Sequence, residues 1–197
     1  MVLIERPDPG SILSFISGQA GQGFSYAPVG ATKGDSPAGF VEDHNRIELG
    51  RGKRAFDAAC QAINEWKMFD LGWVDVFPSD APIVAGTNVA VLARVFGVWF
   101  LNCCRIVYTV DDDGPVRSVG FAYGTLPEHA ESGEERFTVE WHRRDDSVWY
   151  DLLAFSRPNQ FLARIGYPVA RTLQKRFATD SKKAMLRYTL RSLAANS

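Results

Sequence analysis

The chain has 197 residues, of which 46% are hydrophobic and 23% charged, values typical of an ordinary globular protein. At this length we expect a single domain over residues 1–197. A formal net charge of −1 predicts no general attraction to nucleic acid, so no nucleic-acid partner is expected.

The first half of the chain predicts two helices and two strands. Residues 11–18 form a short helical pattern, and a turn followed by a strand is expected around Phe24–Tyr26. Residues 46–49 alternate polar and apolar side chains, as a half-buried strand does. A helix over about residues 53–69 follows, because apolar side chains recur there at helical spacing.

Strands dominate the middle of the chain. Alternating segments predict them at residues 88–95, 98–110, 116–125, 135–141 and 148–155. The loops between them are short, with a polar turn at 111–115 and another at 143–147, so neighbouring strands should be antiparallel. Arg94 and Arg105 interrupt the apolar region 83–110, which is therefore expected to form buried strands and no transmembrane segment.

The last segment predicts a basic helix starting near Asn159 and interrupted at Gly166-Tyr-Pro168, since proline lacks the amide donor. From Asn159 onward the net charge is +7, and the rest of the chain carries −8. Such a helix either docks on the acidic body or binds an anionic surface or partner. The predicted fold class is α+β, with antiparallel strands preceding one long terminal helix.

Motifs for cofactors and metals are weak. Residues 50–55 match the form Gly-x-Gly-x-x-Ala of a dinucleotide-binding turn, but the strand before them alternates and no further βα units follow. Asp111-Asp-Asp-Gly resembles part of a calcium loop and lacks the downstream ligands. The three cysteines show neither a disulfide framework nor metal-ligand spacing. We expect no cofactor and no metal, and a reducing, cytoplasmic location.

The most informative titratable group is His129, in a predicted polar loop with Glu131, Glu134 and Glu135. Carboxylates near an imidazole could support general acid–base chemistry, with His129 acting beside Glu131 or Glu134. The alternative is that the cluster orders the loop through contacts with Arg136 or Arg157. No nucleophile accompanies the cluster. Ser156, at the end of the last strand, is a candidate N-cap of the terminal helix.

Several motifs together resemble a bacterial and plant family of unknown function in the START-like, or helix-grip, superfamily. They are Phe-Ala-Tyr-Gly-Thr-Leu-Pro at 121–127, Gly-Glu-Glu-Arg-Phe at 133–137, Ala-Phe-Ser-Arg-Pro at 154–158 and Trp-x-Met-Phe at 66–69. The resemblance covers about residues 20–190. It implies a curved antiparallel sheet around a long C-terminal helix, enclosing an apolar cavity. Relatives in that superfamily bind lipids, sterols, polyketides or plant hormones, and some are enzymes.

The resemblance implies a small hydrophobic or amphipathic ligand, such as a lipid, isoprenoid or polyketide, held between the sheet and the terminal helix. The candidate ligand-binding residues are Tyr123, Thr125, His129, Arg136, Trp99, Phe121 and Tyr150. No catalytic residue is implied. Two alternatives stay open: a cyclase- or hydrolase-like enzyme using His129 with Glu131 or Glu134, and an interaction module using the basic terminal helix. Ligand identity and oligomeric state stay open too.

Overall fold

In the computed structural model, which describes residues 1–159 and 167–195, eight strands form one antiparallel sheet. The strand order is β2-β8-β7-β6-β5-β4-β3, with β1 paired to β5. The strands are β1 (Val2–Leu3), β2 (Val41–Arg51), β3 (Val74–Phe77), β4 (Asn88–Val95), β5 (Val98–Asp113), β6 (Val116–Thr125), β7 (Glu131–His142) and β8 (Ser147–Pro158). Neighbours in sequence from β3 to β8 are neighbours in the sheet, and for β4 to β8 this is the arrangement that the short loops predicted.

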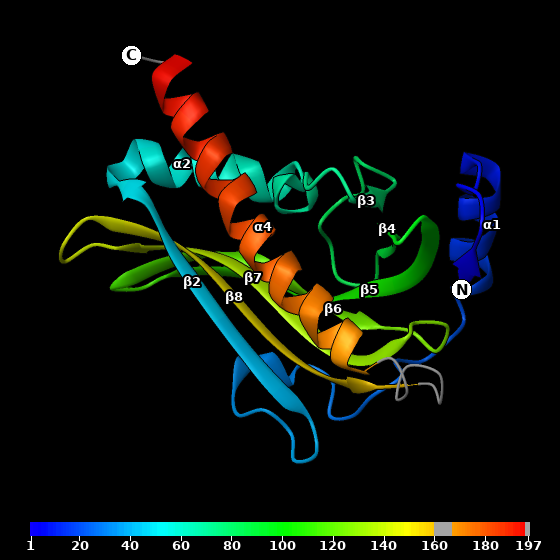
Figure 1. Ribbon diagram of the computed structural model, residues 1–197. Coiled ribbons are helices and arrows are strands. Elements are labelled where there is room, and N and C mark those ends of the chain that lie inside the picture. Colours follow the sequence, from blue (N-terminus) through cyan, green and yellow to red (C-terminus); the bar gives the residue numbers. More distant parts are fainter. Residues whose placement is uncertain (160–166, 196–197) are drawn as a thin grey trace.

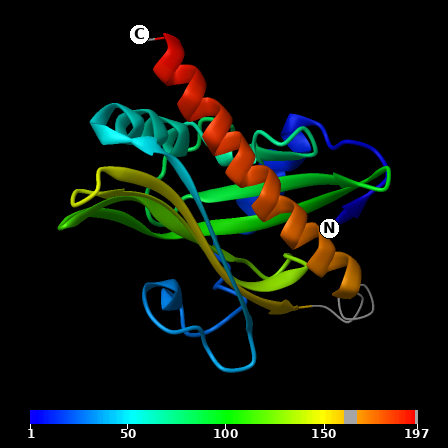
Figure 2. The ribbon, with the colours of Figure 1, turned by 60° about the vertical axis from the view of Figure 1, so that its left-hand side comes forward.

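The helices lie on both sides of this sheet. They are α1 (Pro9–Gly18), α2 (Gly52–Asn64) and α4 (Tyr167–Ala195), with short 3-10 turns η1 (Ala31–Lys33) and η2 (Lys67–Phe69). The long helix α4 crosses the concave face of the curved sheet and packs on α2, η2 and β2 (Figures 1 and 2). This arrangement is the helix-grip fold, and the α+β prediction is confirmed.

The core lies between the concave face, α2 and α4. Side chains alternate along each strand, so Phe121, Phe137 and Tyr150 point inward and are fully buried. The Phe121 ring stacks on Phe137 at 5.2 Å and meets Trp66 edge-on at 4.9 Å. Aromatic burial at the α2 end of the sheet therefore fixes the position of the helices.

The turn into α2 explains the two closely spaced glycines. Gly52 adopts a φ of 81°, and its amide donates a 2.9 Å hydrogen bond to the carbonyl of Asp146. A register shift between Glu48 and Gly50 bends β2 immediately before it. The sheet around this turn is antiparallel, so the Gly-x-Gly pattern serves a tight helix entry and not a dinucleotide site.

Several expectations about the first half of the chain need correction. Phe24–Tyr26 is irregular rather than a strand, and β1 and β3 were not predicted. The helix expected over 53–69 ends at Asn64, because Trp66 takes a left-handed φ of 55° and starts η2. The indole of Trp66 donates a 2.9 Å hydrogen bond to the carbonyl of Ala81, which holds this break in place.

The ends of the last two strands also differ from expectation. β7 begins at Glu131, four residues earlier than predicted, so Glu131, Glu134 and Glu135 belong to a strand and only residues 126–130 form the connection. β8 continues to Pro158. Ser156 is consequently a strand residue and not a helix cap.

The basic helix α4 docks on the acidic body. Arg171 forms an ion pair with Asp43 on β2, and Lys182 donates to the side chain of Asn45 on the same strand. Asn159, where the helix was expected to start, is not helical, and residues 160–166, which include Gly166 of the expected interruption, lie outside the described part of the chain. Pro168 lies in the first turn of α4, where its missing amide donor costs nothing. None of the described helices is long and apolar enough to cross a membrane.

Candidate functional site

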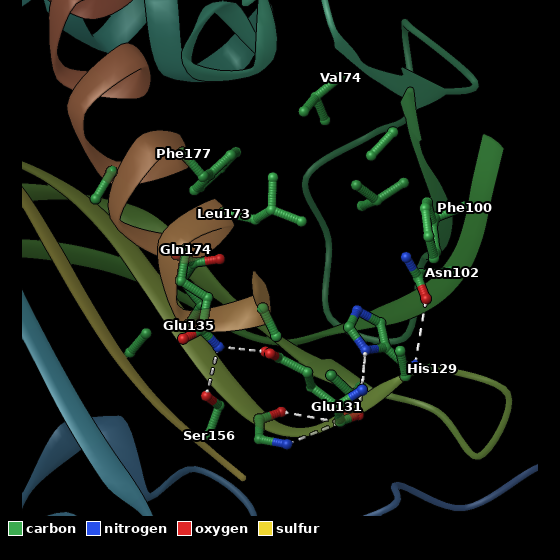
Figure 3. Close-up of a pocket in the computed structure, with 18 of the residues that line it drawn as sticks. Val74, Phe100, Asn102, His129, Glu131, Glu135, Ser156, Leu173, Gln174 and Phe177 are labelled. Atoms are coloured by element: carbon green, nitrogen blue, oxygen red, sulfur yellow. Dashed lines mark hydrogen bonds between the residues drawn. The ribbon is translucent and has the colours of Figure 1, made fainter. Parts of the chain in front are cut away.

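A cavity of about 1070 Å³ lies between the first half of α4 and the concave face of the sheet. Its walls are largely apolar and are formed by Val74, Val91, Ala93, Phe100, Leu173 and Phe177, several of which appear in Figure 3. These residues come from β3, β4, β5 and α4, so the cavity exists because the helix stands away from that half of the sheet. A largely apolar pocket of about this size is typical of small-molecule sites.

The cavity has one polar end, and its first element is a Tyr–Glu pair. The hydroxyl of Tyr123 on β6 donates a 2.8 Å hydrogen bond to the carboxyl group of Glu135 on β7. The two residues are directly opposite in the ladder, so both face the cavity. Burial raises the pKa of Glu135 to about 7, and burial also raises the pKa of Tyr123. This carboxyl group can therefore exchange its proton near neutral pH.

A second carboxyl group is tied to the helix. Gln174 on α4 donates to Glu131 at 2.5 Å and to the hydroxyl of Ser156 at 2.9 Å (Figure 3). Burial raises the pKa of Glu131 from its ordinary value, although the hydrogen bond from Gln174 opposes the shift. Arg171 donates in turn to the amide oxygen of Gln174 at 2.6 Å. This side-chain network joins α4 to β7 and β8 at the edge of the cavity.

His129 and Asn102 complete the polar end. The Nδ1 atom of His129 lies 3.0 Å from the amide nitrogen of Glu131 and 3.1 Å from its carbonyl oxygen. The side-chain oxygen of Asn102 accepts a 3.3 Å hydrogen bond from the amide of Ala130. Burial lowers the pKa of His129 to about 4, so its ring is neutral at physiological pH. Thr125 lines the same end, where its hydroxyl exchanges hydrogen bonds with Gly133.

The structure separates Glu134 from this group. Glu134 borders the cavity through its strand, but its carboxylate accepts hydrogen bonds from the Tyr26 hydroxyl at 2.6 Å and the Gly30 amide at 2.7 Å. Those partners belong to the N-terminal loop that covers the convex face. The expected pairing of His129 with Glu134 does not occur, because neighbouring strand residues point to opposite faces.

Arg136 lies on that same outer side. It donates to the carbonyl of Thr32 at 2.9 Å and pairs with the buried carboxylate of Asp151 at 3.1 Å. Arg136 is not among the cavity-lining residues, and neither it nor Arg157 orders the His129 connection. The guanidinium of Arg157 instead stacks over the Phe40 ring at 4.4 Å.

Three aromatic candidates also lie outside the cavity lining. Phe121 and Tyr150 are fully buried in the core, where the Tyr150 hydroxyl shares a 2.9 Å hydrogen bond with Ser181. Trp99 packs on the convex side with α1, below the guanidinium of Arg94. Of the seven expected ligand-binding residues, the structure brings Tyr123, Thr125 and His129 to the cavity.

Two polar residues of the site were not anticipated. Gln174, three residues before Phe177, is among the residues that carry the family resemblance, but it was not predicted to belong to the site. Asn102 could have been recognised from the sequence, because it is the single polar residue in the run Val98–Cys104 of a strand expected to be buried. A lone amide in such a strand needs hydrogen-bond partners, which points to a polar contact or a cavity.

The chemistry available at this end is hydrogen bonding and proton exchange. Glu135 can be neutral or charged near pH 7, and a neutral His129 is a weak base whose Nδ1 is already engaged. Among the described residues, no three His, Cys, Asp or Glu side chains are grouped so as to hold a metal ion. This arrangement can orient an amphipathic molecule so that its polar group lies at this end of the cavity.

Comparison with known proteins places the chain in a family. The family model described as "Domain of unknown function (DUF1990)" matches residues 25–184. A UPF0548 protein of Dictyostelium discoideum is 35% identical over 205 residues, covering 95% of each chain. Among solved structures, a hypothetical protein of Helicobacter pylori is similar with a TM-score of 0.52 at 10% identity, over 76% of this chain and 87% of that one. Human STARD10 is similar with a TM-score of 0.46 at 14% identity, over 94% of this chain and 82% of that one.

Proposed function

This chain belongs to the DUF1990 family, a domain of unknown function, and we propose that it binds a small hydrophobic or amphipathic molecule in the cavity beneath α4. The observation that carries the proposal is the cavity itself, about 1070 Å³ with largely apolar walls and a cluster of hydrogen-bonded polar groups at the ends of β6 and β7. An apolar ligand entering it would remove both its own surface and the walls from water, at roughly 25 cal/mol per Å². Sites that hold small molecules combine such walls with a few fixed polar groups.

The position of the cavity also supports this function. Its walls come from elements far apart in sequence, β3, β4, β5 and α4, and several of the side chains that line it appear in Figure 3. A protein selected only for stability would fill this space, because unfilled apolar volume reduces the free energy of unfolding. The space is consistent with a ligand that supplies the missing contacts.

A hydrocarbon probe tests the proposal without assuming any polar recognition. Delipidated protein is titrated with diphenylhexatriene, whose fluorescence rises in apolar surroundings, and saturable binding is expected. Val91→Trp places an indole in the cavity and should weaken binding at least tenfold. Leu173→Trp fills the same space from the α4 side. Val84→Trp is the matched control, because Val84 is exposed and outside the lining.

The outcomes separate clearly once folding is verified by circular dichroism and thermal melting. Equal binding by Val91→Trp, Leu173→Trp and the wild type would place the probe elsewhere and contradict the proposal. Absence of binding to the wild type would contradict it as well. Native mass spectrometry of freshly purified protein adds an independent measurement, in which a co-purified small molecule is expected and is lost from the two cavity variants.

A further inference from the structure

Two side chains at the polar end have their acceptor atoms held by successive backbone amides. The amide N–H of Ala130 donates to the side-chain oxygen of Asn102, so the Asn102 NH₂ group must be directed away from the backbone and toward the cavity (Figure 3). The next amide, that of Glu131, lies 3.0 Å from Nδ1 of His129. The two amides belong to the last residue of the connection between β6 and β7 and to the first residue of β7.

The tautomer of His129 follows from where the Glu131 amide points. The Asn159 amide donates to the Ala130 carbonyl across the β7–β8 ladder, so the neighbouring pair, Glu131 and Pro158, turns its backbone groups away from β8. The Glu131 N–H and C=O therefore both face His129, at 3.0 and 3.1 Å from Nδ1. An amide N–H can only donate, and an orphaned amide is rarer than an under-satisfied carbonyl, so Nδ1 accepts and the ring proton lies on Nε2.

The result is a pair of N–H donors at one end of an apolar cavity. We propose that the Asn102 NH₂ group and the His129 Nε2–H bind the carbonyl oxygen of an uncharged lipophilic ligand. This inference rests on the proposed function and specifies the class of ligand. A carbonyl oxygen has two lone pairs and no proton, so it accepts from both donors at once.

The neighbouring carboxyl groups favour an uncharged ligand over an anionic one at the donor pair, although Lys175 and the N-terminal residue Met1 also line the cavity. Glu131 and Glu135 line the same cavity, and the charge of Glu131 helps to raise the pKa of Glu135. A carboxylate ligand would add a third negative charge to a space in which the charges of Glu131 and Glu135 are already disfavoured by burial. A ketone, aldehyde or ester avoids this repulsion and still satisfies both donors.

Prodan, a neutral aromatic ketone, tests the donor pair directly. Its emission moves to longer wavelength when its carbonyl accepts a hydrogen bond, whereas diphenylhexatriene has no oxygen and reports only the cavity. In the wild type, bound prodan should emit at longer wavelength than in an alkane solvent. Asn102→Leu and His129→Phe should each shift that emission to shorter wavelength and weaken prodan binding about tenfold, the loss expected for one hydrogen bond. Diphenylhexatriene binding should change less than twofold.

The control is Asn88→Leu, the same substitution on the adjacent strand β4, where Asn88 contacts Arg105 outside the cavity. It should leave prodan emission unchanged. If Asn102→Leu unfolds, Asn102→Asp keeps the oxygen that accepts from Ala130 and, measured above pH 7, replaces the donor with an acceptor.

Each result bears on one of the two proposals. Diphenylhexatriene binding together with prodan emission that is the same in wild type, Asn102→Leu and His129→Phe would overturn the donor pair and leave the cavity proposal standing. Failure of diphenylhexatriene to bind would overturn the cavity proposal and the donor pair that rests on it. Nitrogen-15 NMR of the imidazole is a further check: a proton on Nε2 is expected, and a proton on Nδ1 would overturn the inference.

Discussion

The hydroxyl of Tyr26 donates a 2.6 Å hydrogen bond to the carboxylate of Glu134, which lies 108 positions further along the chain. The same carboxylate accepts from the amides of Gly30 and Thr32 at 2.7 and 3.0 Å. Glu134 is nearly fully buried. One side chain thus fastens the N-terminal loop to the convex face, opposite the cavity, and its charge is satisfied entirely by neutral donors.

Replacing this carboxylate should destabilise the protein without affecting the cavity. In Glu134→Gln one acceptor oxygen becomes an NH₂ group that faces backbone N–H donors, so we expect a loss of about 2–4 kcal/mol in the free energy of unfolding. Tyr26→Phe removes one donor and should cost about 1 kcal/mol. Urea unfolding measures both, with the exposed Glu5→Gln as the control. A loss no larger than in Glu5→Gln would show that the loop is not held by this carboxylate.

Tyr26 can reach Glu134 only because the neighbouring strand has no side chain at position 124. A Cβ on Gly124 would overlap the Tyr26 hydroxyl and ring. Gly124→Ala should therefore displace the loop and lower the free energy of unfolding by roughly 1–3 kcal/mol, the usual range for overpacking. Gly21→Ala is the control, since a Cβ there meets nothing within 4 Å. Equal stability of the two variants, measured by thermal melting, would contradict the close packing described.

The buried carboxyl group of Glu135 should make stability depend on pH in a defined window. Its pKa is about 7 in the folded state and near 4.5 when unfolded, so between these values the folded state binds more protons. Stability contributed by the protonated group is therefore complete below pH 4.5 and is lost as the pH rises through 7. Glu135→Gln removes this dependence, and above pH 7.5 it should be more stable than wild type by at most about 3 kcal/mol.

Urea unfolding of both proteins from pH 4.5 to 8.5 gives the difference directly. Tyr123→Phe serves as a second measurement, because losing the hydrogen bond that lowers the pKa of Glu135 should move the window to higher pH. A constant difference between wild type and Glu135→Gln across the whole range would mean that Glu135 titrates as an exposed carboxyl group does.

The architecture was accessible from the sequence, but the faces of β7 were not. Alternation and short loops predicted five antiparallel strands and a terminal helix, because both signals are local. The start of β7 carries no apolar alternation, since Glu131, Ser132 and Gly133 precede the first aromatic residue. A prediction that began the strand at Glu135 left its neighbours in a loop and could not assign them to opposite faces.

The partners that decide the role of each acidic residue are distant in sequence. Glu134 is bound by residues more than 100 positions earlier, and Glu131 by Gln174, 43 positions later. No spacing rule connects such pairs, so the acidic cluster was predicted as one group although it serves two sides of the sheet. His129 was recognised by its residue type and by the acidic residues that follow it at 131, 134 and 135. Its role as a donor depends on the Glu131 amide, which only the register of β7 reveals.

The bridge between Gln174 and Glu131 should control how firmly the first turns of α4 hold the cavity closed. Gln174→Leu keeps a side chain of similar size but leaves Glu131 and Ser156 without their donor, and Arg171 loses one acceptor. We expect a loss of about 1–3 kcal/mol in the free energy of unfolding, because buried polar groups become unsatisfied.

Amide exchange near residues 171–177 should accelerate more than in the C-terminal half of α4, which packs on α2. Gln61→Leu is the matched control, since Gln61 is exposed and bonds only locally to Glu65. Uniform exchange along α4 in Gln174→Leu would show that the bridge does not anchor that end of the helix.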